Sequence, residues 1–147
     1  MAYEQRSVGM KDVFKAMIVG GVFLLSLPAL AETAGGLKSG EQVYRETCIA
    51  CHGPGLAGAP RVGDRRIWGK LASEGQAVLT AHGWVGVRAM PPRGGRNDLS
   101  LEEFARAVAW MVRESGGNWQ DPDARLLERI RVEEGKRIEQ LRKAGKG

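Results

Sequence analysis

Five consecutive residues, Cys48 to His52, contain most of the side chains in this sequence that could do chemistry, in the order Cys-Ile-Ala-Cys-His. Two thiols three residues apart on a helical turn can both add to the vinyl groups along one edge of a haem. The residue that follows the second cysteine then points its imidazole at the iron. The pattern therefore predicts one haem c per chain, attached covalently through Cys48 and Cys51 and ligated by His52.

The cysteine pair has three other uses, and each fits the sequence less well. A thioredoxin-like redox pair is expected in a βαβ setting, which the sequence does not suggest. A structural disulfide gives no reason for the histidine that follows. A zinc site needs about four ligands, but the adjacent Cys51 and His52 cannot easily converge on one metal, and only His82 remains. Haem attachment is the interpretation that gives each residue of the motif a task.

The second axial ligand of the iron has to come from Met90, His82 or Met111, unless that position is open. Met90 precedes Pro91-Pro92 and Gly94-Gly95, so it lies in a loop that proline stiffens and that cannot close into a helix. A rigid loop can hold a thioether against a metal. Met111 lies on an apolar helical stripe, where core packing is the usual role. His82 would give a bis-histidine haem of lower potential, but it lies at an expected helix end. Met90 is therefore the favoured ligand.

The first 31 residues are typical of an export signal. Lys11 and Lys15 precede an uncharged apolar stretch from Ala16 to Leu30, and a small-x-small ending places cleavage after Ala31. An uncleaved membrane anchor is the alternative, although the stretch is short against the ~20 apolar residues that span a bilayer. We expect a periplasmic or otherwise exported protein that meets a membrane only through an uncleaved signal or a membrane complex.

The charge of the chain favours acidic partners. Its 22 Lys and Arg against 17 Asp and Glu give a net charge of +5, yet no basic run is dense enough to predict nucleic-acid binding. Five arginines are expected around the haem-edge loops. They are Arg65, Arg66, Arg88, Arg93 and Arg96.

Helical patterns are clearest at the two ends of the expected domain. A first helix is predicted from about Ser39 into the cysteine motif. A last helix begins with the capping box of Ser100 and Glu103 and stops at Gly116-Gly117. Its apolar stripe comprises Leu101, Phe104, Ala105, Val108, Met111 and Val112.

The middle of the chain predicts short helices and loops. One or two helices are expected at 67–72 and 74–82, followed by a loop rich in proline and glycine at 83–97. No alternating strand pattern appears. The fold class is therefore all-α, with about four helices around one haem between Gly36 and Gly117.

Several motifs between Gly40 and Gly117 resemble those of small class I monohaem cytochromes c, most closely the bacterial cytochrome c5 group. The resemblance covers about half of the chain and lacks the extra cysteine pair that often follows the methionine loop in the c5 group. The motifs are Gly40-x-x-Val43-Tyr44, Cys48-x-x-Cys51-His52-Gly53, Gly58-Ala59-Pro60, Met90-Pro91-Pro92-Arg93-Gly94-Gly95 and Leu99-Ser100.

This resemblance implies further site residues. The carbonyl of Pro60 would accept a hydrogen bond from His52 Nδ1, which fixes the ring and its basicity. Trp68 matches a position near the haem propionates. The resemblance also implies that the first helix crosses the last near Gly40, Tyr44 and Trp110.

Function follows from a site with no open position. With His52 and Met90 both bound, the iron can change oxidation state but cannot readily bind oxygen or peroxide. The sequence therefore predicts electron transfer between redox proteins, at a potential raised by the thioether, and not an enzyme. A peroxidase or gas sensor would need Met90 to be off the iron.

About thirty residues follow the end of the resemblance. We expect a signal peptide at 1–31, a cytochrome c domain at 32–119 and an amphipathic helical extension at 120–147, capped by Asp121 with Pro122 at its first position. Its apolar face, interrupted by Glu134, needs a surface, which is the chain's own domain, another subunit, a second copy or, least favoured because the face is narrow, a membrane. The alternative function is therefore a fixed cytochrome subunit of a larger redox or photosynthetic complex. The residues of that face are Leu127, Ile130, Ile138 and Leu141.

Overall fold

A computed structural model describes residues 36–145, and the expected export signal and its cleavage site lie outside them. Over these residues the chain is helical and has no β-strand, only a single bridged pair, Val87 and Met90. The all-α prediction is confirmed. The helices are α1 (Gly40–Val43), a π-helical turn (Tyr44–Cys48), α2 (Ile49–His52), α3 (Arg65–Ala72), α4 (Gln76–Val85), α5 (Leu101–Glu114) and α6 (Ala124–Lys143), with 3-10 turns at Leu56–Gly58 and Pro92–Gly95.

The first helix runs without a break from α1 into the cysteine motif, as predicted. Ser39 caps it by accepting a hydrogen bond from the Gln42 N–H at 3.1 Å. The π-helical turn in its middle was not expected. There the Ile49 N–H donates to the Tyr44 carbonyl, five residues back. Such turns are rare and frequently occur at functional sites, and this one leads directly into the motif.

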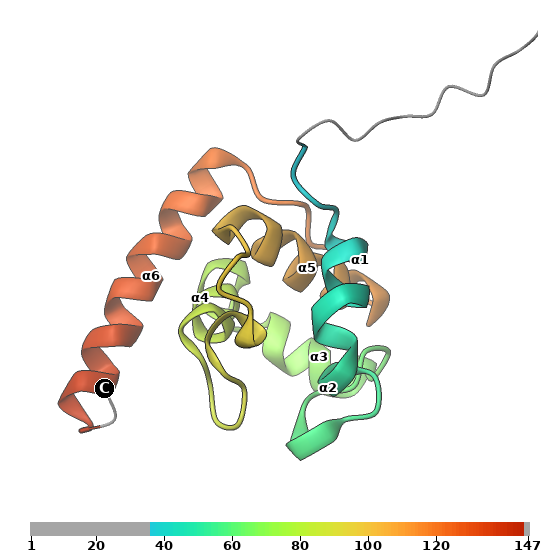
Figure 1. Cartoon of the computed structure of the whole chain (residues 1–147), viewed down its shortest axis with the longest axis horizontal. Helices are drawn as coiled ribbons and strands as arrows, with labels where there is room; N and C mark the ends of the chain where they lie inside the picture. The colour runs from blue at the N-terminus through green and yellow to red at the C-terminus, as the bar shows by residue number, and fades with distance from the viewer. Residues whose placement is uncertain (1–35, 146–147) are drawn as a thin grey trace, which may run out of the picture. The chain divides into compact units, whose positions relative to one another are not determined.

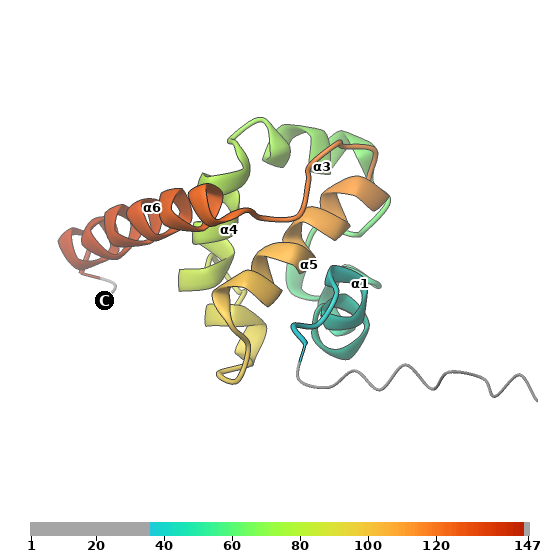
Figure 2. The ribbon, with the colours of Figure 1, turned by 90° about the horizontal axis from the view of Figure 1, so that it is seen from above.

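Helices α1 and α5 cross in close contact (Figure 2). A Cβ atom on Gly40 would lie 2.2 Å from the Arg106 carbonyl oxygen and 2.9 Å from Trp110 Cβ, so only glycine fits there. Next to this contact the rings of Tyr44 and Trp110 pack with their centroids 4.5 Å apart. The crossing expected at Gly40, Tyr44 and Trp110 is confirmed.

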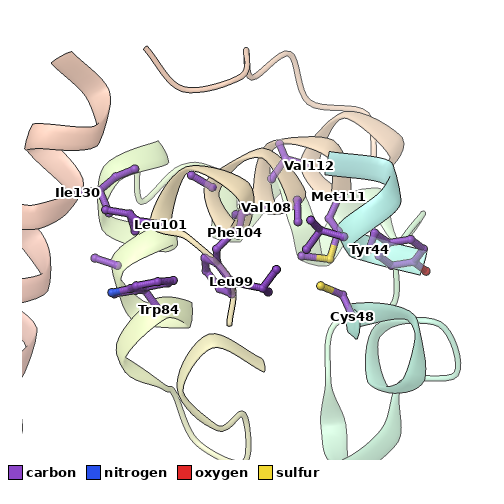
Figure 3. Packing of buried hydrophobic residues seen from close by; sticks show 14 of the residues in the cluster. Tyr44, Cys48, Trp84, Leu99, Leu101, Phe104, Val108, Met111, Val112 and Ile130 are labelled. Carbon is purple, nitrogen blue, oxygen red and sulfur yellow. The ribbon is translucent and has the colours of Figure 1, made fainter. Parts of the chain in front are cut away.

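Helix α5 supplies the largest part of the core, and its two ends are fixed as predicted. The capping box of Ser100 and Glu103 is complete. At the other end Gly116 adopts a φ of 94°, and the Gly117 N–H donates back to the Val112 carbonyl at 2.9 Å. This is the glycine-dependent stop that lets the last carbonyls find donors. Figure 3 shows the apolar side of α5 packed in the core, including Phe104, Val108, Met111 and Val112.

Helix α4 begins and ends later along the chain than predicted. The expected loop was placed from Gly83 onward, but the helix continues to Val85 and ends at Gly86, whose φ is 102°. Gly83 is buried within the helix, and Phe104 packs so close that a Cβ atom on Gly83 would lie 3.1 Å from Phe104 Cζ. His82 therefore lies in the last turn of the helix and not at its final residue. Its Nδ1 lies 3.3 Å from Glu74 Oε2.

The start of α6 differs from the prediction. Asp123, and not Asp121, caps the helix by accepting from the Leu126 N–H at 2.7 Å, and Pro122 lies before the helix. Asp121 instead accepts a hydrogen bond from Arg113 at 3.0 Å. Asp121 is thus bound to Arg113, and Asp123, two residues later, takes the capping position.

Helix α6 packs against α4, so it docks on the chain's own domain (Figure 1). Leu126 and Ile130 are buried in this contact, and Glu134 accepts a hydrogen bond from Trp84. Ile138, by contrast, is 51% exposed. Among the helices that the structure describes, none is long and apolar enough to cross a membrane.

Candidate haem site

His52 is held in one orientation at the end of α2. The side chain is buried, and its Nδ1 lies 2.9 Å from the Pro60 carbonyl oxygen. A carbonyl can only accept, so Nδ1 carries the proton and donates, which leaves Nε2 of the neutral ring with a free lone pair. The Val62 N–H also donates to the His52 carbonyl at 2.9 Å. The loop of Pro60 thus fixes the tautomer that a metal requires.

Cys48 and Cys51 differ in exposure although they share one helical turn. Cys48 is buried and Cys51 is exposed, and both thiols are free. Burial, and secondarily the nearby Cys51, raises the pKa of the Cys48 thiol to about 11. Cys48 therefore lies at the edge of the core and Cys51 at the surface.

Trp68 supports the segment that positions His52. It is buried, its indole Nε1 donates to the Arg61 carbonyl at 2.8 Å, and its ring centroid lies 6.0 Å from that of His52. The indole thus stabilises the backbone next to Pro60. The family resemblance implies a place near the haem propionates for Trp68, and that contact stays a prediction.

Met90 is fixed through its backbone. Its N–H donates to the Val87 carbonyl at 2.9 Å, and the Val87 N–H donates to the Met90 carbonyl at 3.1 Å. Its side chain packs against the core, with Cε 3.6 Å from where a Cβ on Gly83 would lie. Pro91 follows in extended backbone. The Met90 thioether therefore extends from a short turn after α4 that is held by two backbone hydrogen bonds.

The donors present fit a covalently bound haem. An imidazole with a free Nε2, a thioether on a fixed turn and two free thiols are the donors that c-type haem uses. Within residues 36–145 no group of three or more His, Cys, Asp and Glu side chains could hold a metal ion, so the zinc alternative has no support there. Sequence reasoning missed the part played by Trp84 and Glu134, because their contact joins positions 50 residues apart.

Comparisons with known proteins agree with this chemistry. The family model described as cytochrome c oxidase, cbb3-type, subunit III matches residues 35–111, which leaves α6 outside the matched range. Cytochrome c-555 of Chlorobaculum tepidum is 34% identical over 110 residues, covering 72% of this chain and 99% of that protein. Cytochrome c5 of Azotobacter vinelandii is 42% identical over 79 residues, covering 52% and 95%.

A solved structure is also similar. It is described as the electron transfer complex of nitrite reductase with cytochrome c, and the matching chain is 38% identical, with a TM-score of 0.50 over 52% of this chain and 93% of that chain. The family model, the relatives and this structure point to the same fold and the same cofactor. The chain belongs to the class I monohaem c-type cytochromes, fits the cytochrome c5 group within them, and carries covalently attached haem c.

Proposed function

We propose that His52 and Met90 are the two axial ligands of the haem and that the protein passes single electrons between redox proteins through a site with no open coordination position. The haem supplies the one-electron chemistry when bound. The observation that carries this proposal is the hydrogen bond from His52 Nδ1 to the Pro60 carbonyl at 2.9 Å, because it leaves Nε2 ready for iron. Holding both axial positions keeps oxygen and peroxide off the iron, which favours a carrier over an enzyme.

The surroundings of the other candidate ligands support Met90. His82 faces the carboxylate of Glu74. Met111 is 3% exposed and belongs to the hydrophobic core. Met90 combines a fixed backbone with a partly buried side chain on the loop after α4.

Replacing Met90 by alanine is expected to open the iron and lower the reduction potential. The thioether favours the ferrous form, so its loss should lower the potential by on the order of 0.1 V, a fraction of the ~0.8 V range that axial ligands set. The ferric spectrum should lose its sulfur-to-iron charge-transfer band, and the ferrous form should bind CO promptly. The matched controls, His82→Ala and Met111→Leu, should keep the band. A band that persists in Met90→Ala would assign the ligand elsewhere.

The redox partners are proposed to be acidic. Arg65, Arg66 and Arg88 are exposed, whereas the Arg96 guanidinium binds Asp98 and lowers the pKa of that carboxyl to about 2. Arg96 is therefore partly neutralised, whereas Arg65, Arg66 and Arg88 present their charge at the surface.

The rate of electron transfer with an acidic partner should fall as salt is added. The Debye length shortens from about 30 Å at 0.01 M to about 10 Å at 0.1 M salt. An association that is accelerated by attraction between opposite charges should therefore slow roughly tenfold. Stopped-flow mixing measures the second-order rate constant. A rate that is independent of salt would contradict an acidic partner.

The second candidate function, a fixed subunit of a larger complex, is favoured by the exposed Val132 and Ile138 of α6. It predicts a rate of electron transfer that is independent of the concentration of added partner.

A further inference from the structure

A chain of contacts links the C-terminal helix to the loop that carries Met90. Glu134 Oε1 on α6 accepts a hydrogen bond from Trp84 Nε1 on α4 at 2.9 Å. Figure 3 shows the indole nitrogen of Trp84 pointing out of the core toward α6. Trp84 is only 8% exposed, so its N–H depends on this acceptor to replace lost water.

Trp84 contacts the Met90 loop, residues 86–95, from the other side. The guanidinium carbon of Arg93 lies 4.4 Å from the centroid of the Trp84 ring, a cation–π contact that favours a fixed ring. Arg93 sits in the loop at a φ of 56°, which is uncommon for a residue with a side chain. The loop therefore uses the face of Trp84 as a support for a residue held in an unfavourable backbone conformation.

The same ring packs against Phe104, whose ring lies close to the methionine side chain. Trp84 packs edge-on against Phe104 with ring centroids 5.5 Å apart. A Cβ on Gly83 would lie 3.1 Å from Phe104 Cζ and 3.6 Å from Met90 Cε, so these side chains share one small space. A shift of Trp84 would therefore reach both the backbone of the loop, through Arg93, and the surroundings of the thioether.

We propose that Glu134 is a positioning residue for the sixth iron ligand: by holding Trp84 it keeps the Met90 loop in place, so the C-terminal helix controls how firmly Met90 stays on the iron. This inference rests on the proposed ligation by Met90. In this chain of contacts Glu134 acts through its hydrogen bond with Trp84. The extension thus acquires a role in the redox site that does not depend on any partner protein.

The test is the rate at which imidazole binds to the ferric holoprotein, because Met90 must leave before imidazole can enter. At saturating imidazole the rate reports the opening of the Met90 loop. Glu134→Ala should speed it about tenfold, which corresponds to about 1.4 kcal/mol, while Glu134→Gln, whose amide oxygen still accepts, should stay within about twofold of the native rate. Glu139→Ala is the control, because Glu139 pairs with Arg142 on the same helix and not with the domain.

A double-mutant cycle tests the route through Trp84. Trp84→Phe keeps an aromatic ring but removes the N–H, so it should also speed imidazole binding, and adding Glu134→Ala to it should change the rate no further. The proposal would be overturned if the effects of the two substitutions on the rate of imidazole binding were additive, or if Glu134→Ala left that rate unchanged. It would also be overturned if Glu134→Gln, or the control Glu139→Ala, raised the rate as much as Glu134→Ala does. A native protein without the sulfur-to-iron band would instead refute ligation by Met90, a failure that is visible before any variant is made.

Discussion

A protein in which both Cys48 and Cys51 are replaced by alanine is expected to release its haem into acidic acetone, whereas the native protein should retain it. The thioether bonds form on these two thiols, and the sequence contains no other cysteine. Each single variant should keep one bond and therefore its haem. Because a bound group stabilises the folded state by mass action, the double variant should also unfold at a markedly lower temperature.

The measurement combines acid-acetone extraction with the spectrum of the pyridine haemochrome, which shifts as each vinyl group is left unreacted. Cys51→Ala should show one free vinyl group and the double variant two. Extraction of haem from the native protein, or a Cys51→Ala protein with both vinyl groups reacted, would contradict attachment through this pair. Met111→Leu, a volume-conserving core change, is the control for damage to the core beside Cys48.

Replacing Gly40 by alanine is expected to cost on the order of 3 kcal/mol in the free energy of unfolding, at the upper end of overpacking effects. The added Cβ would lie 2.2 Å from the carbonyl oxygen of Arg106 and 2.6 Å from its carbon, and both are backbone atoms that cannot rotate away. Helix α1 must therefore move off α5. Since domains of this kind are stable by only about 5–15 kcal/mol, the loss is large.

Guanidinium unfolding of the holoprotein, followed by circular dichroism, measures this cost. Gly135→Ala on α6 is the matched control, since nothing lies within 4 Å of a Cβ there. That change should stabilise its helix, by about 1 kcal/mol at most. Equal stabilities for Gly40→Ala and the native protein would mean that the two helices do not cross as tightly as described.

The elements that the sequence predicted well are those whose signals are local. The capping box of Ser100 and Glu103 lies within one turn, and the stop at Gly116 depends on one residue that accepts a positive φ. Both act through the nearest backbone groups, so neighbouring residues suffice to read them. The His52 contact with Pro60 came from a different source, a resemblance to a family, because an eight-residue loop has no local rule that brings its ends together.

The predictions that failed involve contacts between distant parts of the chain. Asp121 and Asp123 have the same capping side chain, but Asp121 accepts a hydrogen bond from Arg113 and Asp123 caps the helix. Glu134 read as an interruption of an apolar face because its partner, Trp84, lies on another helix. Gly83 read as the start of a loop because the side chain that packs close to it, Phe104, lies on another helix.

The crossing of α1 and α5 also sets the order in which the protein can be assembled. The Lys38 N–H on one side of this contact donates to the Glu103 carboxylate, 65 positions later, so the contact cannot form until most of the domain has been synthesised. In the folded chain Cys48 is buried and its thiol has a pKa of about 11, which leaves little of the reactive thiolate. We therefore expect haem to be attached to the open chain, with α5 closing over a helix that already carries it.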